Sequence, residues 1–475
     1  MPTNLRVLFV FREVPDTPDY YYHILERLHG LPGLEVFVVM GVTGNRPALK
    51  GSGGSFTFRV RECRETALRS GDRCLPSLGR ELWRVRPHVV VTVTEYLRSF
   101  RLQAGVRMSR RLLRFKLILK SIPFRTPELA QFRSELEARI ASRLAQPSRW
   151  SRQGGREASR VPTSRAATRF TDTGRWVDLL RRALARWRVR AACREQCSWW
   201  RLPDAHVNYV SDGRRIYGSY GVATERIFMI GNSPDTDRLF SIRARCEAEG
   251  IRHDARRVVH VGRLVEWKRV DLLLAAVAEL RQHHGDLELV IAGEGPMEPP
   301  WRALRERLGI AACTRFLGGV YDTADLGRVL ASSGVYVLAG MGGISINDAM
   351  CFGLPVICST CDGTERALVR DGVTGLFFKD GEAGDLARKL GVLLADPAMQ
   401  RSMGTAGEAR IRREVNIYTV LAGYVRAFQG VTGRPLHDAL GHLTMCAASR
   451  GYAFPPVSLA EERDGPIRRN QDKGQ

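Results

Sequence analysis

The chain has 475 residues, of which 44% are hydrophobic and 26% are charged, and its formal net charge is +23. This composition excludes an intrinsically disordered chain, and the length exceeds the roughly 250–300 residues at which a single hydrophobic core stops growing, so we expect two domains. A protein this basic needs either an anionic partner or an environment that tolerates its charge, and nucleic acid, an anionic membrane and a phosphorylated substrate are the candidate partners.

The first half of the chain alternates short apolar runs with helical patterns, which is typical of parallel α/β sheets. Helices are predicted over residues 20–28 and 77–85, and strands over residues 5–11, 35–40, 88–94 and 116–119. The first apolar run is too short for a signal peptide, because Arg12 and Glu13 follow it directly. No run reaches the about 18–20 apolar residues of a transmembrane helix.

Two basic amphipathic segments, from Leu102 to Arg114 and from Trp176 to Arg190, stand out in this half. In both, apolar residues recur at helical spacing and arginines line the remainder. A basic helix of this kind suits the surface of an anionic membrane, and the alternative is a helix that packs on the core and exposes its arginines to water. Residues 147–169, rich in Ser, Arg, Gly and Pro, are predicted to form a mobile insertion.

The second half repeats the plan more regularly. Strands are predicted over residues 258–261, 287–292, 315–317, 335–338, 355–358 and 375–378, and helices over residues 271–281, 300–308, 323–331, 345–352 and 382–394. Two such halves predict two Rossmann-like domains, each a parallel doubly wound sheet, that face a cleft. Ligands of open α/β sheets bind beyond the carboxyl ends of the strands.

A turn-rich cluster at residues 231–235 marks the predicted join between the domains. We expect one domain over residues 1–235, a second over residues 236–412, and a helical segment over residues 413–450 that returns toward the first domain. Residues 451–475 are predicted to form a polar tail. The ten cysteines are scattered through apolar segments, which favours reduced thiols in a cytosolic protein, and their spacing matches no recognisable zinc site.

Two elements of the second half are suited to bind phosphate. Gly262 and Arg263 follow a predicted strand and Lys268 lies five residues further on, so an arginine fork and a lysine charge share one loop. The Gly342-Gly343-Ile344 stretch leads into a helix whose N-terminus offers free N–H groups and a positive dipole end. Asp348, about one turn into that helix, can accept two hydrogen bonds from a ribose diol. The alternative is that the basic residues are incidental and that Asp348 is a surface acid favoured by the dipole.

Residues 258–394 resemble the C-terminal donor domain of family 4 glycosyltransferases, which are group 1 glycosyl transferases of the GT-B fold. The resemblance is carried by G-R-L-x-x-x-K at 262–268, G-E-G-P at 293–296, F-L-G at 316–318 and D-A-M-C-F-G-L-P-V-I at 348–357. The first half is similar to the family only in its α/β plan and in a turn at 232–237. The resemblance implies that the N-terminal domain faces the acceptor and that the C-terminal domain binds a nucleotide-sugar donor.

The resemblance also implies roles for individual residues. Arg263 and Lys268 would be the catalytic cations that hold the donor diphosphate, and Asp348 would bind the ribose. The donor-binding set would be Gly262, Glu294, Gly295, Leu317, Gly318, Gly342, Gly343, Ile344 and Asp348. The family usually retains anomeric configuration and needs no metal or other cofactor. The resemblance further implies that this chain transfers a sugar to a glycan or lipid-linked acceptor in polysaccharide or lipopolysaccharide biosynthesis.

One position departs from the family pattern, which has two glutamates separated by seven residues. Counting back from Asp348 places Gly340 at the first of them. The first glutamate normally contacts the donor sugar, so its absence implies a variant subgroup. On the acceptor side, Asp16, His23 and Glu95 lie near the ends of predicted strands, where a histidine or carboxylate could act as a base. The alternative for each is an ordinary surface or core residue.

Other functions are alternatives to the transferase. A GT-B epimerase also binds sugar and phosphate between two such domains, whereas a phosphorylase is disfavoured because no lysine is clearly placed for a pyridoxal Schiff base. An inactive relative that binds anionic surfaces remains an alternative. No nucleic acid partner is expected, because the basic stretches lack an ordered reading motif. The sequence therefore predicts a cytoplasmic enzyme, peripheral at the inner face of a membrane.

Overall fold

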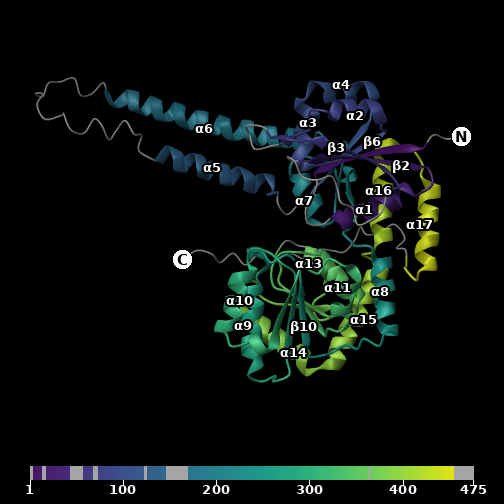
Figure 1. The fold of residues 1–475 in the computed structure, drawn as a ribbon. Helices are drawn as coiled ribbons and strands as arrows, with labels where there is room; N and C mark the ends of the chain where they lie inside the picture. Colours follow the sequence, from purple (N-terminus) through teal and green to yellow (C-terminus); the bar gives the residue numbers. More distant parts are fainter. Residues whose placement is uncertain are drawn as a thin grey trace, which may run out of the picture.

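The computed structural model describes residues 4–12, 18–42, 57–67, 73–121, 126–145, 170–361 and 364–453. It contains a seven-stranded sheet of order β3-β2-β1-β6-β7-β8-β9 and a six-stranded sheet of order β12-β11-β10-β13-β14-β15. Neighbouring strands in both sheets are parallel. Helices cover the sheets, and the two α/β units lie one above the other in Figure 1. The predicted pair of parallel, doubly wound sheets is confirmed.

The seven-stranded sheet and its helices come from the first half of the chain. Its elements are β1 (Leu5–Arg12), α1 (Pro18–His29), β2 (Leu34–Val42), β3 (Arg59–Arg64), α2 (Leu78–Val85), β6 (Val89–Val93), α3 (Leu97–Leu102), α4 (Ala104–Leu113), β7 (Lys116–Lys120), α5 (Leu129–Ala145), α6 (Phe170–Trp200), β8 (Ala205–Asn208), α7 (Asp212–Ser219) and β9 (Ile227–Met229). Two short strands, β4 (Thr66–Ala67) and β5 (Arg73–Cys74), pair antiparallel beside it.

The six-stranded sheet and its helices follow. Its elements are α8 (Thr236–Ala248), β10 (Arg257–Val261), α9 (Val270–Arg281), β11 (Glu288–Ala292), α10 (Glu298–Arg307), β12 (Thr314–Gly318), α11 (Thr323–Ala331), β13 (Val335–Leu338), α12 (Ile344–Cys351), β14 (Val356–Cys358), α13 (Thr364–Leu368), β15 (Gly375–Phe377), α14 (Ala383–Ala395) and α15 (Pro397–Arg413). The chain ends in α16 (Ile417–Thr432) and α17 (His437–Ser449).

The alternation of side chains along β1 explains why the first sheet is covered on both faces. Val7 and Phe9 are buried on the face that packs against α1, α16 and α17. Leu8 and Val10 are buried on the opposite face, beneath α2, α3 and α4. Because successive residues of a strand point to opposite faces, an unbroken apolar run signals a strand buried on both sides. The second sheet has two core clusters of the same kind, one on each face.

Sequence patterns identified the central strands better than the edges. Every strand predicted in either half is present, and no strand end differs from its prediction by more than two residues. Three strands of the first sheet, β3, β8 and β9, escaped prediction. β3 is an edge strand that exposes several charged side chains, whereas β8 and β9 are only four and three residues long. The segment from Leu102 to Arg114 is divided, because α3 ends at Leu102 and α4 begins at Ala104.

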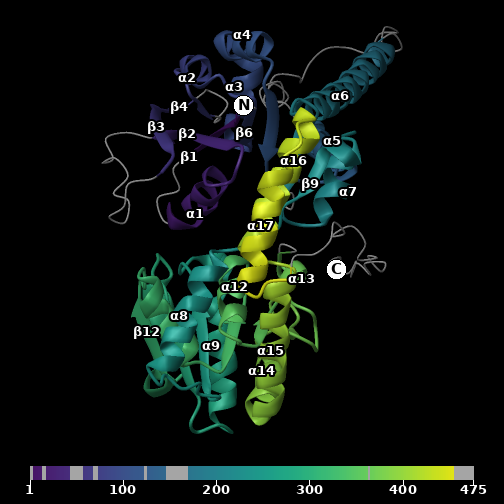
Figure 2. The ribbon, with the colours of Figure 1, turned by 90° about the vertical axis from the view of Figure 1, so that its right-hand side faces the viewer.

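The C-terminal helices cover the first sheet, not the second. Asn416 caps α16, since its side chain accepts the backbone N–H groups of Tyr418 and Thr419 at 3.1 Å each. Further along α16, the rings of Tyr424 and Phe428 pack edge-on against Phe9 of β1, with centroids 5.8 and 6.5 Å away. Figure 2 shows α16 running up beside the first unit. The chain therefore crosses between the units twice, once before α8 and once before α16.

The first crossing is held by two acids at the start of α8. Arg27 of α1 donates to Asp235 at 2.7 Å and to Asp237 at 2.9 Å. Asp237 also accepts hydrogen bonds from Tyr418, at 2.8 Å, and from Arg450. Burial alone would lower the pKa of the Arg27 guanidinium, but these two carboxylates together raise it above its ordinary value. The acidic turn thus fastens α1 and both C-terminal helices to the beginning of the second unit.

Some predictions fall on residues of which the structure gives no account. The insertion predicted over residues 147–169 lies outside the described residues, as do residues 454–475 of the predicted tail. Tyr452, at the start of that tail, is buried and donates to Thr236 at 2.9 Å. The ten cysteines are free thiols. None of the described helices combines the length and apolar character needed to cross a membrane.

Candidate functional site

The loops that carry the glycine motifs meet at the carboxyl edge of the six-stranded sheet. They follow β10, β11, β12 and β13, and β10 lies between β11 and β13. The strand order changes direction there, since the chain moves outward to β11 and β12 and then returns to the other side of β10. Such switch points are where open α/β sheets leave room for a ligand.

Glycines in these loops allow one backbone to touch another. A Cβ on Gly293 would lie 1.9 Å from the carbonyl oxygen of Gly262, and a Cβ on Gly295 would lie 2.4 Å from that of Leu264. The contacts are reinforced by hydrogen bonds from Leu264 N–H to the Glu294 carbonyl (2.8 Å) and from Gly293 N–H to the Gly318 carbonyl (2.7 Å). The loops after β10, β11 and β12 are therefore packed main chain to main chain, and together they form the floor of the candidate site.

Lys268 extends beneath two of the glycine loops. It ends a short 3₁₀ turn, Glu266–Lys268, that precedes α9. Its Nζ lies 3.7 Å from the Cβ position of Gly262 and only 2.2 Å from that of Gly342. A side chain at 342 would displace the flexible ammonium group, and the positive φ of 155° at this position favours glycine. Lys268 is half-buried, whereas Arg263 is exposed at the mouth of the same loop.

Asp348 lies on α12, behind the glycines that begin this helix. Burial raises the pKa of its carboxyl to about 7. Ser345, on the preceding turn, accepts a hydrogen bond from Tyr336 of β13 at 2.6 Å. Gly343 is the N-cap of α12 and carries no side chain to cap it, and Ile344 is the first helical residue. The first N–H groups of the helix thus end at the same edge as Lys268.

Gly340 is enclosed by main chain. A Cβ at this position would lie 2.1 Å from the carbonyl oxygen of Trp267, and the next residue, Met341, donates its N–H to that same oxygen at 2.9 Å. The space in which a glutamate side chain would begin is therefore filled by the turn that carries Lys268. The glycine that replaces the family's glutamate at position 340 therefore allows the loop after β13 to pack against this turn.

The remaining predicted donor residues line the neighbouring loops. Glu294 accepts a hydrogen bond from the Tyr321 hydroxyl at 2.5 Å, which joins the loop after β11 to the loop after β12. Leu317 and Gly318 end β12, and both are half-buried. Gly295 adopts a positive φ of 157° where it meets the main chain of Leu264. These positions frame the same carboxyl edge from the side of β12.

The predicted acceptor-side residues are not assembled into one group. Asp16 lies outside the described residues. His23 is half-buried on α1, and Glu95 is exposed at the end of β6, where it accepts from the Thr94 hydroxyl at 3.1 Å. Both residues are described, and no hydrogen bond or ion pair joins them. Whether either acts on a substrate stays a prediction.

The sequence did not reveal two titratable groups of the sheets, the half-buried Lys120 and the buried His260. Lys120 ends β7, its Nζ is 3.6 Å from the centre of the Tyr21 ring, and burial lowers its pKa to about 7. His260 is fully buried on β10, bonds the Val337 carbonyl through Nδ1 at 3.0 Å, and has a pKa lowered to about 4 by burial. In each case the sequence signal that could have revealed the group was a polar residue within an otherwise mainly apolar strand.

His260 directs its second ring nitrogen toward the floor of the site. Its Nε2 is buried, has no hydrogen-bond partner among the described residues, and lies 3.7 Å from the Cβ position of Gly262. Because the ring stays neutral at ordinary pH and Nδ1 faces a carbonyl, Nδ1 carries the proton and Nε2 is an acceptor. This acceptor nitrogen and the Lys268 ammonium therefore both lie 3.7 Å from the Cβ position of Gly262.

Residues 242–410 of this chain match the family described as glycosyl transferases group 1. The chain is 30% identical over 174 residues to the putative glycosyltransferase EpsD of Bacillus subtilis, which covers 37% of this chain and 45% of that protein. It is 30% identical over 197 residues to a GDP-mannose-dependent alpha-(1-6)-phosphatidylinositol monomannoside mannosyltransferase of Mycolicibacterium smegmatis, covering 39% and 49%. The chain spans about half the length of these relatives.

Solved structures resemble the molecule over nearly its whole length. HepE of Anabaena, solved in complex with UDP, superposes with a TM-score of 0.58 at 13% identity, covering 90% of this chain and 100% of that one. WaaG, a glycosyltransferase involved in lipopolysaccharide biosynthesis, gives a TM-score of 0.54 at 14% identity, with coverage of 90% and 100%. The likeness confirms the expected GT-B fold.

Proposed function

We propose that this protein is a glycosyltransferase of the hexosyltransferase type, which moves a sugar from a nucleotide-sugar donor to a glycan or lipid-linked acceptor. The observation that carries the proposal is the position of Lys268. Its ammonium group is enclosed by the Gly262 and Gly342 loops at the switch point of the second sheet. A half-buried cation beside glycine-lined main chain and a helix N-terminus suits a diphosphate.

In this proposal the donor lies along the carboxyl edge of the six-stranded sheet. Lys268 and Arg263 bind the diphosphate, and the N–H groups near Gly343 and Ile344 bind its distal phosphate. Asp348 accepts hydrogen bonds from the ribose hydroxyls, a role for which the carboxylate form is required. The nucleobase lies by Leu317 and Gly318.

The reaction breaks the bond between the anomeric carbon of the sugar and the phosphate oxygen. A new bond forms from the acceptor oxygen to that carbon on the same face, and the acceptor proton passes to the leaving phosphate. Negative charge builds on the diphosphate as it departs, so fixed cations at Lys268 and Arg263 stabilise the transition state more than the ground state. No metal is required in this scheme.

Several similarities support this proposal. HepE was solved with UDP-glucose as well as with UDP, and the mycobacterial relative is described as acting on a phosphatidylinositol mannoside. Both fit a protein that combines a nucleotide-sugar site with a lipid-linked acceptor. Such an acceptor would place the enzyme at the inner face of a membrane.

The test is a thermal-shift series with UDP-, GDP-, ADP- and CMP-sugars, each with and without EDTA. A ligand at 100 times its dissociation constant stabilises the folded protein by about 2.7 kcal/mol, which is several degrees for most domains. We expect a shift with one nucleotide class that EDTA does not change. A shift abolished by EDTA would contradict the metal-independent mechanism, and the absence of any shift would contradict the donor site itself.

A further inference from the structure

Two helices of the N-terminal unit project from the body of the molecule. α6 has 31 residues and α5 has 17, and they lie beside each other as an arm. Figures 1 and 2 show this arm extending away from both sheets. At its root, Trp199 of α6 is stacked by Arg101 of α3, whose guanidinium lies 4.4 Å from the ring centre. The root of the arm is therefore packed against α3.

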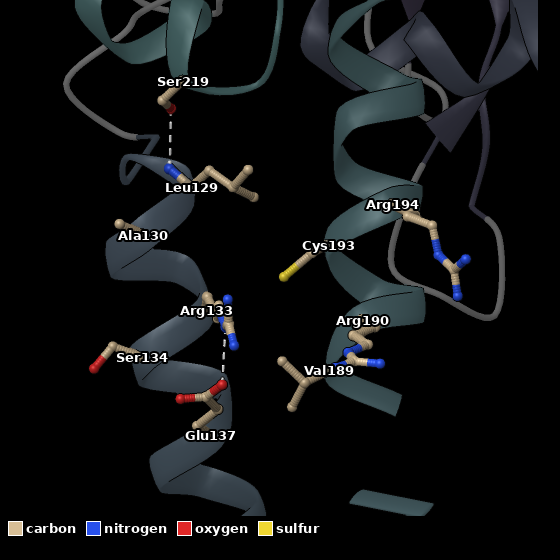
Figure 3. A pocket seen from close by; sticks show the side chains of 10 residues that line it. All are labelled: Leu129, Ala130, Arg133, Ser134, Glu137, Val189, Arg190, Cys193, Arg194 and Ser219. Atoms are coloured by element: carbon tan, nitrogen blue, oxygen red, sulfur yellow. Dashed lines mark hydrogen bonds and ion pairs between the residues drawn. The ribbon is translucent and has the colours of Figure 1, made fainter. Parts of the chain in front are cut away.

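The inner side of the arm is defined by a cavity of about 650 Å³ between α5 and α6. Figure 3 shows Val189 and Cys193 of α6 pointing across it toward α5. Arg194 points away from α5 in the same view, and on α5 an ion pair joins Arg133 to Glu137 at 2.9 Å. The side of α6 that carries Val189 and Cys193 is thus the side that faces its partner helix.

The opposite side of α6 is apolar and exposed. Leu180, Leu184 and Trp187 recur at helical spacing on that side, with exposed fractions of 66%, 49% and 59%. Single exposed apolar residues are ordinary, but a stripe of them along a helix usually marks an interaction surface. Between residues 179 and 194, α6 carries six arginines and no acidic residue.

A second basic surface lies on α4. Leu112 and Met108 are more than half exposed there, and a cavity of about 360 Å³ opens between α4 and the root of α6. The cavity is lined by Phe100, Arg101, Arg107, Arg110, Arg111 and Leu202. In both Figure 1 and Figure 2, α4 and the distal part of α6 lie at the upper end of the molecule, away from the second sheet. One plane can therefore contact both.

We propose that α6 and α4 together form a surface that docks on an anionic lipid bilayer. Leu180, Leu184 and Trp187 enter the boundary between headgroups and acyl chains, and the surrounding arginines contact lipid phosphates. Arg107 and Arg111 supply the cavity in which one anionic headgroup is bound. This inference rests on the proposed function, since it assigns the acceptor to a membrane and names the surface that brings the enzyme there.

Charge and apolar exposure together favour a bilayer over other occupants. Nucleic acid would account for the arginines but would leave the leucine stripe in water. A second copy of the chain could cover the leucines, but it would bring two arginine-rich helices together, and like charges repel. A bilayer with anionic lipids accepts both the apolar stripe and the arginines.

The test is sedimentation of the full chain with phosphatidylcholine vesicles that contain increasing amounts of phosphatidylglycerol. We expect binding that rises with the anionic lipid and weakens with salt. The double variant Leu180→Ser/Leu184→Ser should weaken binding by about tenfold or more, because two leucines lose their transfer into the bilayer. Arg107→Gln/Arg111→Gln should reduce the dependence on phosphatidylglycerol.

The matched control is Val392→Ser/Met445→Ser, which removes two exposed apolar side chains far from the arm and should leave vesicle binding unchanged. All variants should keep the thermal shift produced by the donor nucleotide, so failure of the docking surface is distinguishable from failure of the donor site. Full vesicle binding by Leu180→Ser/Leu184→Ser would overturn the proposal. Binding of the parent to RNA but not to vesicles, or a dimer that this variant dissociates, would also overturn it.

Discussion

The carbonyl oxygen of Trp267 occupies the place where a side chain on Gly340 would begin. A Cβ there would approach it to 2.1 Å, and the Cα of Lys268 lies 3.0 Å from the same point. The loop after β13 and the turn that carries Lys268 are thus packed main chain to main chain. Position 340, which holds an acid in the resembled family, is a glycine here and packs against the turn that positions Lys268.

Gly340→Ala should therefore destabilise the second unit and lower activity, because main chain on both sides cannot move aside easily. Overpacking of this kind costs about 1–3 kcal/mol. The measurement is the unfolding temperature together with sugar transfer. The matched control is Gly384→Ala on α14, where a new Cβ meets nothing within 4 Å. Gly340→Glu should be worse than Gly340→Ala, and recovery of function by the glutamate would contradict this account.

Lys268→Ala should reduce sugar transfer by about tenfold or more while leaving the unfolding temperature close to that of the parent. A charge-assisted hydrogen bond contributes about 1.5–3 kcal/mol, which corresponds to that factor in rate. Steady-state kinetics with a saturating acceptor would measure it. The control is Lys379→Ala, which removes a lysine that pairs only with Glu382 at the surface among the described residues. Equal activity of the two variants would remove Lys268 from the mechanism.

Asp348 should make stability depend on pH. Its carboxyl has a pKa of about 7 in the folded protein, against about 3.9 in an unfolded chain. Between these values the folded state binds more protons, so the free energy of unfolding falls as the pH rises from about 4 to about 7, and this contribution is constant above. Asp348→Asn should remove the decline, which amounts to about 4 kcal/mol at most. Urea unfolding of both proteins across this range would show the difference.

The same residue should make donor binding depend on pH in the opposite direction. If the carboxylate holds the ribose, the affinity of the parent for the donor nucleotide rises as the pH passes through about 7, since only the ionised form accepts two hydrogen bonds. The Asp348→Asn variant should bind more weakly and lose this rise. Calorimetric titration at several pH values is the measurement, and parallel curves for the two proteins would exclude the assigned role.

Removing Asp237 should loosen the first crossing. Its carboxylate accepts from Arg27, Tyr418 and Arg450 together, and Asp237→Ala would leave a half-buried arginine with one acid fewer. Breaking a fully buried pair costs about 3–5 kcal/mol, and partial exposure reduces this to about 2 kcal/mol. The unfolding temperature should fall by several degrees. Glu382→Ala, which breaks an exposed pair with Lys379, should have no measurable effect.

The second sheet could be predicted from the sequence because its strands are mainly apolar runs and most of them lie next to a glycine. The interlocked loops could be anticipated only as glycine motifs. Nothing local reveals that Gly293 needs to be small because Gly262, thirty-one residues earlier, presses its carbonyl against it. Such requirements arise from contacts between distant segments, which periodicity does not record.

The arm formed by α5 and α6 also shows what periodicity cannot predict. Helical spacing identified an amphipathic segment from Trp176 to Arg190, yet α6 runs from Phe170 to Trp200. Spacing also could not say which side would face α5, because Val189 and Cys193 are no more apolar than the leucines on the opposite face. Lys120 was missed because burial, which lowers its pKa, depends on elements that precede and follow it at long range.

The two crossings between the units lie side by side, since the backbone N–H of Ile417, at the second, donates to the Thr236 hydroxyl, at the first, at 3.4 Å. Because the two connections are adjacent, the units can rotate about a single axis that passes through them. The same two connections suppress sliding of one unit past the other. They also make the linkage redundant. A protease that cut either connection would leave both units on one particle, so a nicked enzyme should migrate as two fragments only after denaturation.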